Sequence, residues 1–397
     1  MPQYSSRRTS RSSQPRTNNR NSNRSRFPKK AYIHPSKFVR AAQPKTEADF
    51  TPQHSFADFN LHPLIQRNLT AAGFINPSPI QDEAILEGLN GKDIVGIANT
   101  GTGKTAAFAI PLLQRLITDP TSKALIMAPT RELAQQIEDQ CRIIGKGSNL
   151  TGALLIGGVA MGPQLRELSY GPQIIIGTPG RIKDHLERRS LRLNNCNIVV
   201  LDEVDRMLDM GFVNDIRHIL GETMPLRQNF YFSATLDARV KSIIDGFSND
   251  PVQITVKTGE TSDNVEQNVI TFRSVSEKID KLHDVLIADA TIKTLVFDDT
   301  HRSVEKLAKE LEARGFAADS IHGGKTQFQR DRVLKKFKNN DINVLVATDV
   351  AARGLDVADI THVVNYSSPQ TYDDYVHRIG RTGRAGKIGY ALTFVED

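Results

Sequence analysis

The stretch Ala98-Asn99-Thr100-Gly101-Thr102-Gly103-Lys104-Thr105 follows an apolar run at residues 94–97 and leads into a helical pattern. Gly101 and Gly103 have no Cβ, so backbone N–H groups can close around a polyphosphate, which Lys104 can reach while the Thr105 hydroxyl binds Mg²⁺. A helix starting near Thr105 would point its positive end at the anion. The stretch predicts a phosphate-binding loop, with Ala98 where the strict pattern has Gly. The alternative is a glycine-rich turn that contains Lys-Thr by chance.

Short apolar strands alternate with helical patterns on both sides of this loop, from about residue 56 onward. The predicted strands are residues 94–97, 124–128, 174–176, 198–201 and 229–232, with helices such as 105–117 and 130–144 between them. Such alternation is typical of a parallel α/β fold. Because the strands are almost continuously apolar, we expect a sheet covered by helices on both faces.

After a polar stretch at residues 256–265 the same alternation starts again. The predicted strands are residues 269–272, 294–297, 344–347, 362–365 and 390–394, and the predicted helices are 300–314, 326–338 and 371–379. This second α/β part contains no phosphate loop of its own. We therefore predict a tail and linker at residues 1–50, a phosphate-binding domain at 51–255, a linker at 256–265 and a second domain at 266–397.

The positive charge of the chain is concentrated in its N-terminal tail. Residues 1–40 contain eleven Lys and Arg residues and no Asp or Glu, so a chain of formal charge +6 has −5 on its remaining residues. With almost no aliphatic residue before Ile33, the tail cannot bury enough surface to offset its ordering entropy, and we predict that it is disordered. It could be an arm that contacts nucleic-acid phosphates, a solubilising tail or an organelle transit peptide.

Composition excludes several classes of protein. No run approaches the roughly 18 apolar residues that a membrane span needs, so no membrane partner is expected. Cys141 and Cys196 lie far apart without a CxxC spacing, so neither a disulfide framework nor a zinc site is indicated. This cysteine usage fits a reducing compartment, and we predict the cytoplasm.

Polar residues follow two strands of the first predicted domain. Asp202 and Glu203 come directly after residues 198–201, and Ser233 comes after 229–232. Ligands of an open parallel sheet bind beyond the carboxyl ends of its strands. We predict that Asp202 holds Mg²⁺ and that Glu203 orients or deprotonates an attacking water. The alternative is a solvated turn.

Further motifs occur in a fixed order from Phe56 to the C-terminus. They are GFINPSPIQ at residues 73–81, PTRELA at 129–134, GG at 157–158, TPGR at 178–181, DEVD at 202–205, SAT at 233–235, ATDVAARGLD at 347–356 and HRIGRTGR at 377–384. In this order they resemble the DEAD-box RNA helicases, superfamily 2 enzymes built from two RecA-like domains. The resemblance implies an ATP- and Mg²⁺-dependent enzyme that closes on ATP and RNA together.

The resemblance also implies an ATP site. The implied nucleotide-binding residues are Phe56, Phe74, Gln81, residues 98–105 and Asp356, and the implied catalytic residues are Lys104, Asp202, Glu203, Asp205, Ser233, Thr235, His377, Arg381 and Arg384. Phe56 would stack on adenine, Gln81 would bind the adenine edge and Asp356 would approach the ribose. Arg381 and Arg384 would reach the γ-phosphate as arginine fingers. With Arg378 they are spaced by three, which on a helix would place them on one side.

An RNA interface across both domains is implied in the same way. Its residues are Thr130, Arg131, Gly158, Thr178, Arg181, Thr300, Gln327 and Thr348. Small hydroxyls and glycine N–H groups suit phosphates and 2′-OH groups and cannot read bases, so we expect sequence-independent binding. We expect a monomer, whose RNA target and protein partners the sequence does not identify.

The chain departs from the family pattern at a few positions. Val204 replaces the usual Ala of the signature tetrapeptide, Ser78 replaces Thr, and relatives commonly continue into another helix beyond Asp397. We expect repacking around Val204 without loss of activity. Local strand separation or RNP remodelling is the predicted outcome of ATP hydrolysis. The rival hypotheses are a DNA helicase and an ATP-gated RNA clamp or annealing protein.

Overall fold

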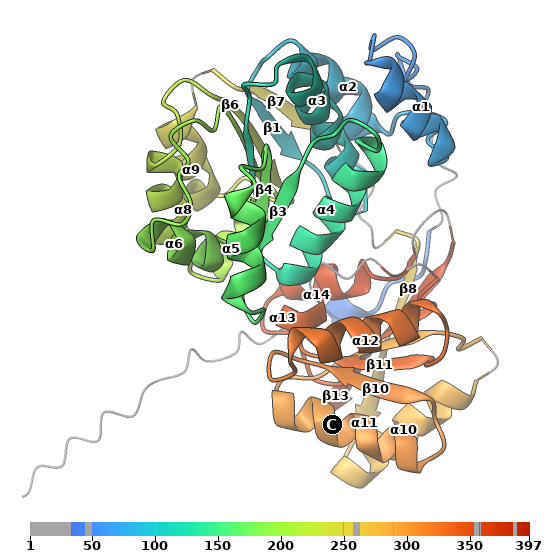
Figure 1. Ribbon diagram of the computed structural model, residues 1–397. Helices are drawn as coiled ribbons and strands as arrows, with labels where there is room; N and C mark the ends of the chain where they lie inside the picture. The colour runs from blue at the N-terminus through green and yellow to red at the C-terminus, as the bar shows by residue number, and fades with distance from the viewer. Residues whose placement is uncertain are drawn as a thin grey trace, which may run out of the picture. The chain divides into compact units, whose positions relative to one another are not determined.

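The structure is a computed structural model that describes residues 33–43, 50–99, 101–248, 250–256, 263–288, 290–352, 357, 359–383 and 387–397. The strands within them form two sheets in which every strand pair is parallel, and helices lie on both sides of each sheet (Figure 1). These are two parallel α/β domains, as the alternating sequence pattern predicts, and they agree with the RecA-like domains that the family resemblance implies. None of the described helices is long and apolar enough to cross a membrane.

The first domain contains a seven-stranded sheet in the order β3-β4-β2-β5-β6-β1-β7. Its strands are β1 (Ile94–Ile97), β2 (Ala124–Met127), β3 (Gly152–Leu155), β4 (Ile174–Gly177), β5 (Ile198–Leu201), β6 (Gln228–Ser233) and β7 (Val252–Thr255). Its helices are α1 (Pro63–Ala71), α2 (Pro79–Leu89), α3 (Lys104–Thr118), α4 (Arg131–Ile144), α5 (Met161–Ser169), α6 (Pro179–Glu187), α7 (Val204–Asp209), α8 (Val213–Gly221) and α9 (Ala238–Phe247).

The second domain contains a six-stranded sheet in the order β10-β11-β9-β12-β13-β8. Its strands are β8 (Val265–Phe272), β9 (Thr294–Phe297), β10 (Ala318–Ile321), β11 (Val344–Ala347), β12 (His362–Asn365) and β13 (Gly389–Glu396). Its helices are α10 (Val275–Ile287), α11 (His301–Ala313), α12 (Gln327–Lys338), α13 (Asp349–Ala352) and α14 (Tyr372–Ile379).

Both faces of each sheet are buried, which explains the apolar strands. In β1, Ile94 packs into one apolar cluster and its neighbour Val95 into another. In β9, Leu295 and Val296 are divided between two clusters in the same way. Since successive strand residues point to opposite faces, a strand covered on both faces must be apolar at every position.

Threonines cap the first turn of several helices. Thr130, Thr300, Thr326 and Thr371 each accept a hydrogen bond from a backbone N–H in the first turn of the helix that follows. A threonine at this position satisfies a backbone donor that has no partner inside the helix. The four predicted helices that begin with these threonines therefore start one residue later, with the threonine as cap.

The boundary between the domains differs from the prediction. Strand β8 begins at Val265, inside the predicted linker 256–265, and Val265 is fully buried beside Gly389 of β13. The polar residues around it obscure the strand in the sequence. Residues 257–262 of that linker lie outside the described residues.

The disorder predicted for the tail at residues 1–40 is wrong for its last part, and the structure describes residues 33–43. These residues contain a short 3₁₀ helix, η1 (Pro35–Phe38), and Phe38 is only 2% exposed. Phe38 packs with residues of the second domain, and Ile33 lies against the same cluster. The average composition of forty residues does not reveal that two apolar side chains, Phe38 and Ile33, pack against another part of the chain. Residues 1–32 and 44–49 lie outside the described residues.

Candidate functional site

The phosphate loop joins β1 to α3 at the carboxyl edge of the first sheet. The Lys104 ammonium is buried and donates a hydrogen bond to the Ala98 carbonyl at 3.0 Å. Gly101 and Gly103 have φ angles of 84° and 90°, in the left-handed region that favours glycine. The Thr102 hydroxyl donates to the Asn99 carbonyl at 2.9 Å. The loop is therefore closed by its own residues, with Thr105 in the first turn of α3.

Residues 78–81 are hydrogen-bonded to this loop. The Gln81 amide donates to the Gly103 carbonyl at 3.1 Å and accepts from the Ser78 backbone N–H at 3.0 Å. The Ser78 hydroxyl donates to the Thr102 carbonyl at 2.8 Å, so Ser78 performs the contact with a hydroxyl as threonine would. A primary amide has two donor hydrogens and two acceptor lone pairs. Gln81 therefore retains one donor and one acceptor for a ligand.

Phe56 and Phe74 meet in the first domain, close to this segment. Phe56 is 4% exposed, and its ring meets that of Phe74 edge-on with centroids 5.8 Å apart. The chain before Phe56 is held by the buried Asp82 carboxylate, which accepts from the backbone N–H groups of Gln53 at 2.7 Å and His54 at 3.1 Å. Sequence reasoning missed Asp82. Its signal is an acidic residue in the first turn of a helix, where free N–H groups attract carboxylates.

The paired carboxylates lie at the end of β5, and the neighbouring strand β6 separates β5 from β1. Asp202 is 2% exposed, and its carboxylate accepts from the Glu203 backbone N–H at 3.0 Å. Burial raises the pKa of Asp202 to about 6, and the nearby Lys104 ammonium opposes that rise. Glu203 has a φ of 52°, an uncommon backbone conformation for a residue with a side chain. The two carboxylates and the phosphate loop therefore share one edge of the sheet.

Asp205 connects the end of β5 to the end of β6. Its carboxylate accepts from the backbone N–H groups of Ala234 and Thr235, both at 3.1 Å, and from the Thr235 hydroxyl at 3.3 Å. The Asp205 backbone N–H donates to the Ser233 hydroxyl at 3.4 Å. The structure thus brings Asp205, Ser233 and Thr235 together.

Arg378 and Arg381, the two described members of the arginine series, do not lie on one helix. Helix α14 ends at Ile379, and Arg381 follows it in a turn. Arg378 is buried in a bidentate ion pair with Asp349, at 2.6 and 2.7 Å. Gly380 is the C-cap residue of the helix, so Arg381 lies beyond the helical spacing. Thr100, Asp356 and Arg384 lie outside the described residues.

His377 of α14 is half-buried beside charges of the first domain. Its Nδ1 atom has no hydrogen-bond partner among the described residues. Burial and the Arg206 guanidinium lower the pKa of His377 to about 3, while Asp205 acts in the opposite direction. The imidazole is therefore neutral at physiological pH. Arg206 itself pairs with Asp374 of α14 at 3.3 Å.

The RNA-binding residues predicted in the first domain follow β2, β3 and β4. Gly158 has a φ of 73°, and a Cβ on it would overlap the Arg131 guanidinium. The Arg181 guanidinium donates to the Val159 carbonyl at 3.2 Å. Thr130 and Thr178 occupy the N-cap positions of α4 and α6. The structure therefore gathers backbone groups, hydroxyls and two guanidinium groups at one sheet edge.

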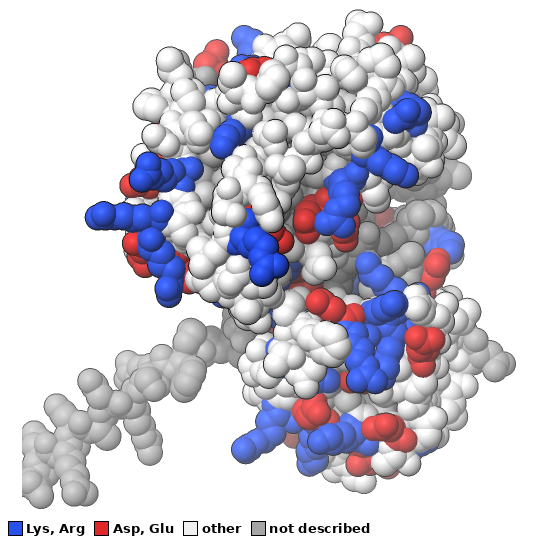
Figure 2. Space-filling model, viewed as in Figure 1, with Lys and Arg blue, Asp and Glu red and all other residues white. Residues whose placement is uncertain are grey.

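The predicted residues of the second domain follow β9, β10 and β11. Thr300 caps α11, Gln327 begins α12 and Thr348 follows β11. The Thr348 hydroxyl is buried without a hydrogen-bond partner among the described residues, which suits a group that awaits a ligand. Figure 2 shows Lys and Arg side chains gathered over α12, whose last turn contains Lys335, Lys336 and Lys338.

Sequence reasoning missed a buried ion pair beside Gln327. The Arg330 guanidinium lies 2.8 Å from the Glu132 carboxylate, and both side chains are almost fully buried. The Gln327 amide donates to Glu132 at 3.4 Å and accepts from Arg131 at 3.5 Å. These partners are almost two hundred residues apart, so no spacing in the sequence could indicate the pair.

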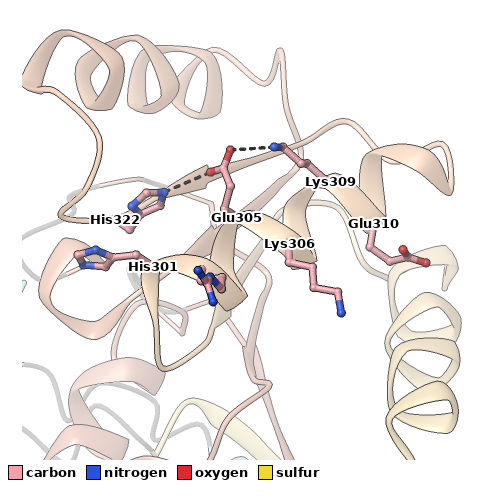
Figure 3. A pocket seen from close by; sticks show the side chains of 7 residues that line it. His301, Glu305, Lys306, Lys309, Glu310 and His322 are labelled. Atoms are coloured by element: carbon pink, nitrogen blue, oxygen red, sulfur yellow. Dashed lines mark hydrogen bonds and ion pairs between the residues drawn. The ribbon is translucent and has the colours of Figure 1, made fainter.

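A cavity of about 650 Å³ on the second domain was also not predicted. Figure 3 shows its lining, which consists of His301, Arg302, Glu305, Lys306, Lys309, Glu310 and His322. His322 lies 3.2 Å from the Glu305 carboxylate, and the rings of His301 and His322 stack with centroids 5.1 Å apart. All of these residues except His322, which follows β10, belong to α11.

Two parallel α/β domains, a phosphate loop and paired carboxylates beyond a nearby strand define a P-loop ATPase of the RecA-like type. Residues 78–243 match the family described as DEAD/DEAH box helicase, and residues 277–386 match the helicase conserved C-terminal domain. The chain belongs to the DEAD-box helicase family and is an ATP-dependent RNA helicase.

Relatives and solved structures agree with this family. The DEAD-box ATP-dependent RNA helicase CshA of Bacillus subtilis is 46% identical over 343 residues, which cover 86% of this chain and 69% of CshA. CshA of Limosilactobacillus reuteri is 43% identical over 342 residues, with the same coverage of both chains. The structure of S. cerevisiae Dbp5 bound to RNA and ADP BeF3 has a TM-score of 0.77 at 29% identity, covering 86% of this chain and 90% of Dbp5.

Proposed function

We propose that this helicase binds the backbone of single-stranded RNA without base specificity and couples ATP hydrolysis to local duplex separation or RNP remodelling. The observation that carries the proposal is the pair Asp202 and Glu203 beyond β5, on the sheet whose phosphate loop contains Lys104. A buried carboxylate beside a phosphate-binding ammonium is the arrangement that P-loop NTPases use for metal and water.

Mg²⁺ fits the first of these carboxylates. Asp202 is buried, and the loss of hydration raises its pKa to about 6. A bound divalent cation would stabilise the negative charge of this carboxylate. We propose Asp202 and the Thr105 hydroxyl as its holders. When bound, the cation would neutralise charge on the β- and γ-phosphates.

The remaining catalytic roles are divided between the domains. Lys104 binds the phosphates, and Glu203 orients or deprotonates the attacking water. Arg381 and Arg384 stabilise negative charge on the γ-phosphate. Asp205 with Ser233 and Thr235 forms the first-domain side of a network that His377 extends, and the effect of Asp205 on the pKa of His377 supports this link.

The signature tetrapeptide of this chain is Asp202-Glu203-Val204-Asp205. Val204 is fully buried in an apolar cluster of the first domain. The two additional carbons relative to Ala are thus accommodated in the core and do not face the carboxylates. This packing supports the proposal that the DEVD variant is active.

The nucleotide base and the RNA are assigned to separate sets of residues. Phe56, Phe74 and Gln81 are proposed for adenine and Asp356 for the ribose. Thr130, Arg131, Gly158, Thr178, Arg181, Thr300, Gln327 and Thr348 are proposed for the RNA backbone. A monomeric state, cytoplasmic location and RNP partners stay predictions.

The variant Glu203→Gln tests the proposal. It should retain ATP and RNA binding but hydrolyse ATP slowly, so that an ATP-dependent RNA complex accumulates in a filter-binding assay. The exposed Glu222, changed to Gln, is the matched control and should turn over normally. If Glu203→Gln fails to bind ATP, Glu203 belongs to the metal site or to the fold.

Two rival functions are separated by the same assay. A DNA helicase would hydrolyse ATP as fast with single-stranded DNA as with RNA of equal sequence. An RNA clamp or annealing protein would bind RNA without RNA-stimulated turnover.

A further inference from the structure

We propose that residues 33–43, here called the N-terminal strap, position helix α14 and thereby the Arg381 that follows it. Phe38 and Arg40 of the strap are then positioning residues for ATP hydrolysis, although neither lies in the proposed ATP site. This inference rests on the role proposed above for Arg381.

The first contact of the strap is apolar. The Phe38 ring lies 4.7 Å from the Tyr375 ring, centroid to centroid, and both side chains are almost fully buried. The buried cluster around them consists of Phe38, Val265, Tyr375, Ile379 and Ala391. Tyr375 and Ile379 are the residues that α14 contributes to this buried cluster. Phe38 is therefore part of the apolar cluster against which this helix packs, here called the seat of α14.

The second contact is a backbone bridge to the edge of the second sheet. The Arg40 N–H donates to the Gln267 carbonyl at 3.0 Å, and the Gln267 N–H donates to the Arg40 carbonyl at 2.8 Å. Gln267 belongs to β8, the last strand of that sheet. Its side-chain carbonyl accepts from the Tyr375 hydroxyl at 2.9 Å. The bridge and the aromatic contact thus converge on the same tyrosine of α14.

The third contact is electrostatic. The Arg40 guanidinium lies 2.6 Å from the Asp263 carboxylate, whose side chain is 9% exposed. The Gln43 N–H donates to the Asp263 carbonyl at 2.8 Å. The Lys37 ammonium lies 5.5 Å from the ring of Tyr372, the first residue of α14. The strap is therefore held along its length by charge, backbone and apolar contacts.

The position of α14 matters because of what the helix carries. It is eight residues long, contains His377, and ends two residues before Arg381. Its fixed points are Arg378, which pairs with Asp349, and the seat that Phe38 completes. A displacement of about 1 Å at a reacting group can cost about a hundredfold in rate. Loss of the strap contact should therefore change catalysis as well as stability.

The test compares Phe38→Ala with Val39→Ala in the full chain, because Val39 is the neighbouring strap residue and is 56% exposed. Phe38→Ala should lower the turnover number at saturating RNA by about tenfold or more. Its affinity for ADP should stay within about twofold, because ADP lacks the γ-phosphate assigned to Arg381 and because the proposed adenine contacts and the phosphate loop lie in the first domain. Val39→Ala should match the unmodified chain, and Phe38→Leu should recover most of the lost rate. Full turnover in Phe38→Ala would overturn the inference.

A charge exchange keeps the test decisive if Phe38→Ala fails to fold. Arg40→Asp and Asp263→Arg should each slow turnover, and the double variant should recover it. Single variants with full turnover would overturn the inference. Arg381→Ala separates the two levels of the proposal: if it keeps full RNA-stimulated hydrolysis, the proposed role of Arg381 fails and the inference fails with it. If it loses hydrolysis while the strap variants do not, only the inference fails.

Discussion

Gln81 illustrates how one side chain can support a loop and still be available to a ligand. Its amide bonds Ser78 and Gly103 with one donor and one acceptor and is 5% exposed. The remaining N–H donor and oxygen lone pair of the Gln81 amide match the adenine edge. Glutamine pairs with adenine in DNA in the same way. At the scale of the residue, the structure therefore connects base recognition to the shape of the phosphate loop.

We predict that Gln81→Ala weakens the preference for ATP over GTP. The bidentate contact to the adenine edge contributes roughly 1–3 kcal/mol of discrimination in base readout generally. Relative kcat/KM values for the two nucleotides measure the effect. Gln253→Ala is the matched control, because Gln253 is an exposed glutamine of β7. An unchanged preference would show that Gln81 only supports the loop.

His377 gives a prediction for acid stability. Its pKa is about 3 in the folded chain because of burial and Arg206, whereas an unperturbed histidine has a pKa of about 6.5. Below pH 6.5 the unfolded chain binds a proton that the folded chain does not, so stability is complete above this pH and is lost as the pH falls. At pH 5 the loss is about 2 kcal/mol.

Denaturation of His377→Gln at pH 7.5 and pH 5 measures this loss. The variant should lose about 2 kcal/mol less than the unmodified chain between the two values. His218→Gln, at an exposed position of α8, should behave as the unmodified chain. Equal pH dependence in all three proteins would mean that His377 is protonated in the folded state.

At the scale of the element, two glycines on either side of β1 show two different reasons for having glycine at a position. Gly91 and Gly103 both have positive φ angles, but a Cβ on Gly91 would meet nothing within 4 Å. A Cβ on Gly103 would overlap the Gln81 amide. Only the second glycine is required by a neighbouring side chain as well as by its backbone.

We predict that Gly91→Ala and Gly103→Ala each destabilise the fold by about 1–2 kcal/mol through left-handed backbone strain. Gly103→Ala should also weaken ATP binding, because it displaces the loop and Gln81 together. Chemical denaturation and nucleotide titration measure the two effects. If both variants bind ATP normally, the loop tolerates the displacement and the proposed base contact is not coupled to it.

The elements that sequence reasoning located best are those buried on both faces. Ile198–Leu201 is β5 as predicted, because every position is apolar. The edge strand β10 was missed, since Asp319 and Ser320 interrupt its apolar pattern. The strap was missed because Phe38 depends on Tyr375, more than three hundred residues away. The local sequence pattern therefore predicts an element when the burial of its own residues determines it. It fails when the element depends on packing against residues far away in the sequence.

The same limit applies to the candidate site. The phosphate loop and the Asp202-Glu203 pair are contiguous motifs that the sequence identifies directly. The buried pair of Glu132 and Arg330 joins residues from separate domains, and no motif contains both. Sequence order therefore predicts the chemistry of each loop, while side-chain pairing between loops has to be observed.

At the scale of the whole molecule, charge is divided unevenly along the chain. Positive and negative side chains are interspersed on the face shown in Figure 2. Residues 1–32 contain nine Lys and Arg residues and no acidic residue. The basic character of the chain therefore belongs to its N-terminal residues, which offer positive charge to a polyanion at long range.

We predict that removal of residues 1–32, which leaves the strap intact, weakens RNA affinity at low salt. The slope of log K against log salt should become shallower by about 0.7 for each phosphate no longer neutralised. Maximal ATPase at saturating RNA should not change, since every proposed catalytic residue lies after Phe56. Identical salt slopes for the two chains would favour a solubilising or targeting role for these residues.

The most direct test of the account is the rate of ATP hydrolysis by Lys104→Ala, measured with and without single-stranded RNA beside the unmodified chain. Lys104 is buried at the phosphate loop and influences the pKa of Asp202. We expect RNA-stimulated hydrolysis in the unmodified chain and background hydrolysis in a folded Lys104→Ala variant. RNA-stimulated hydrolysis retained by that variant would contradict the assignment of the site.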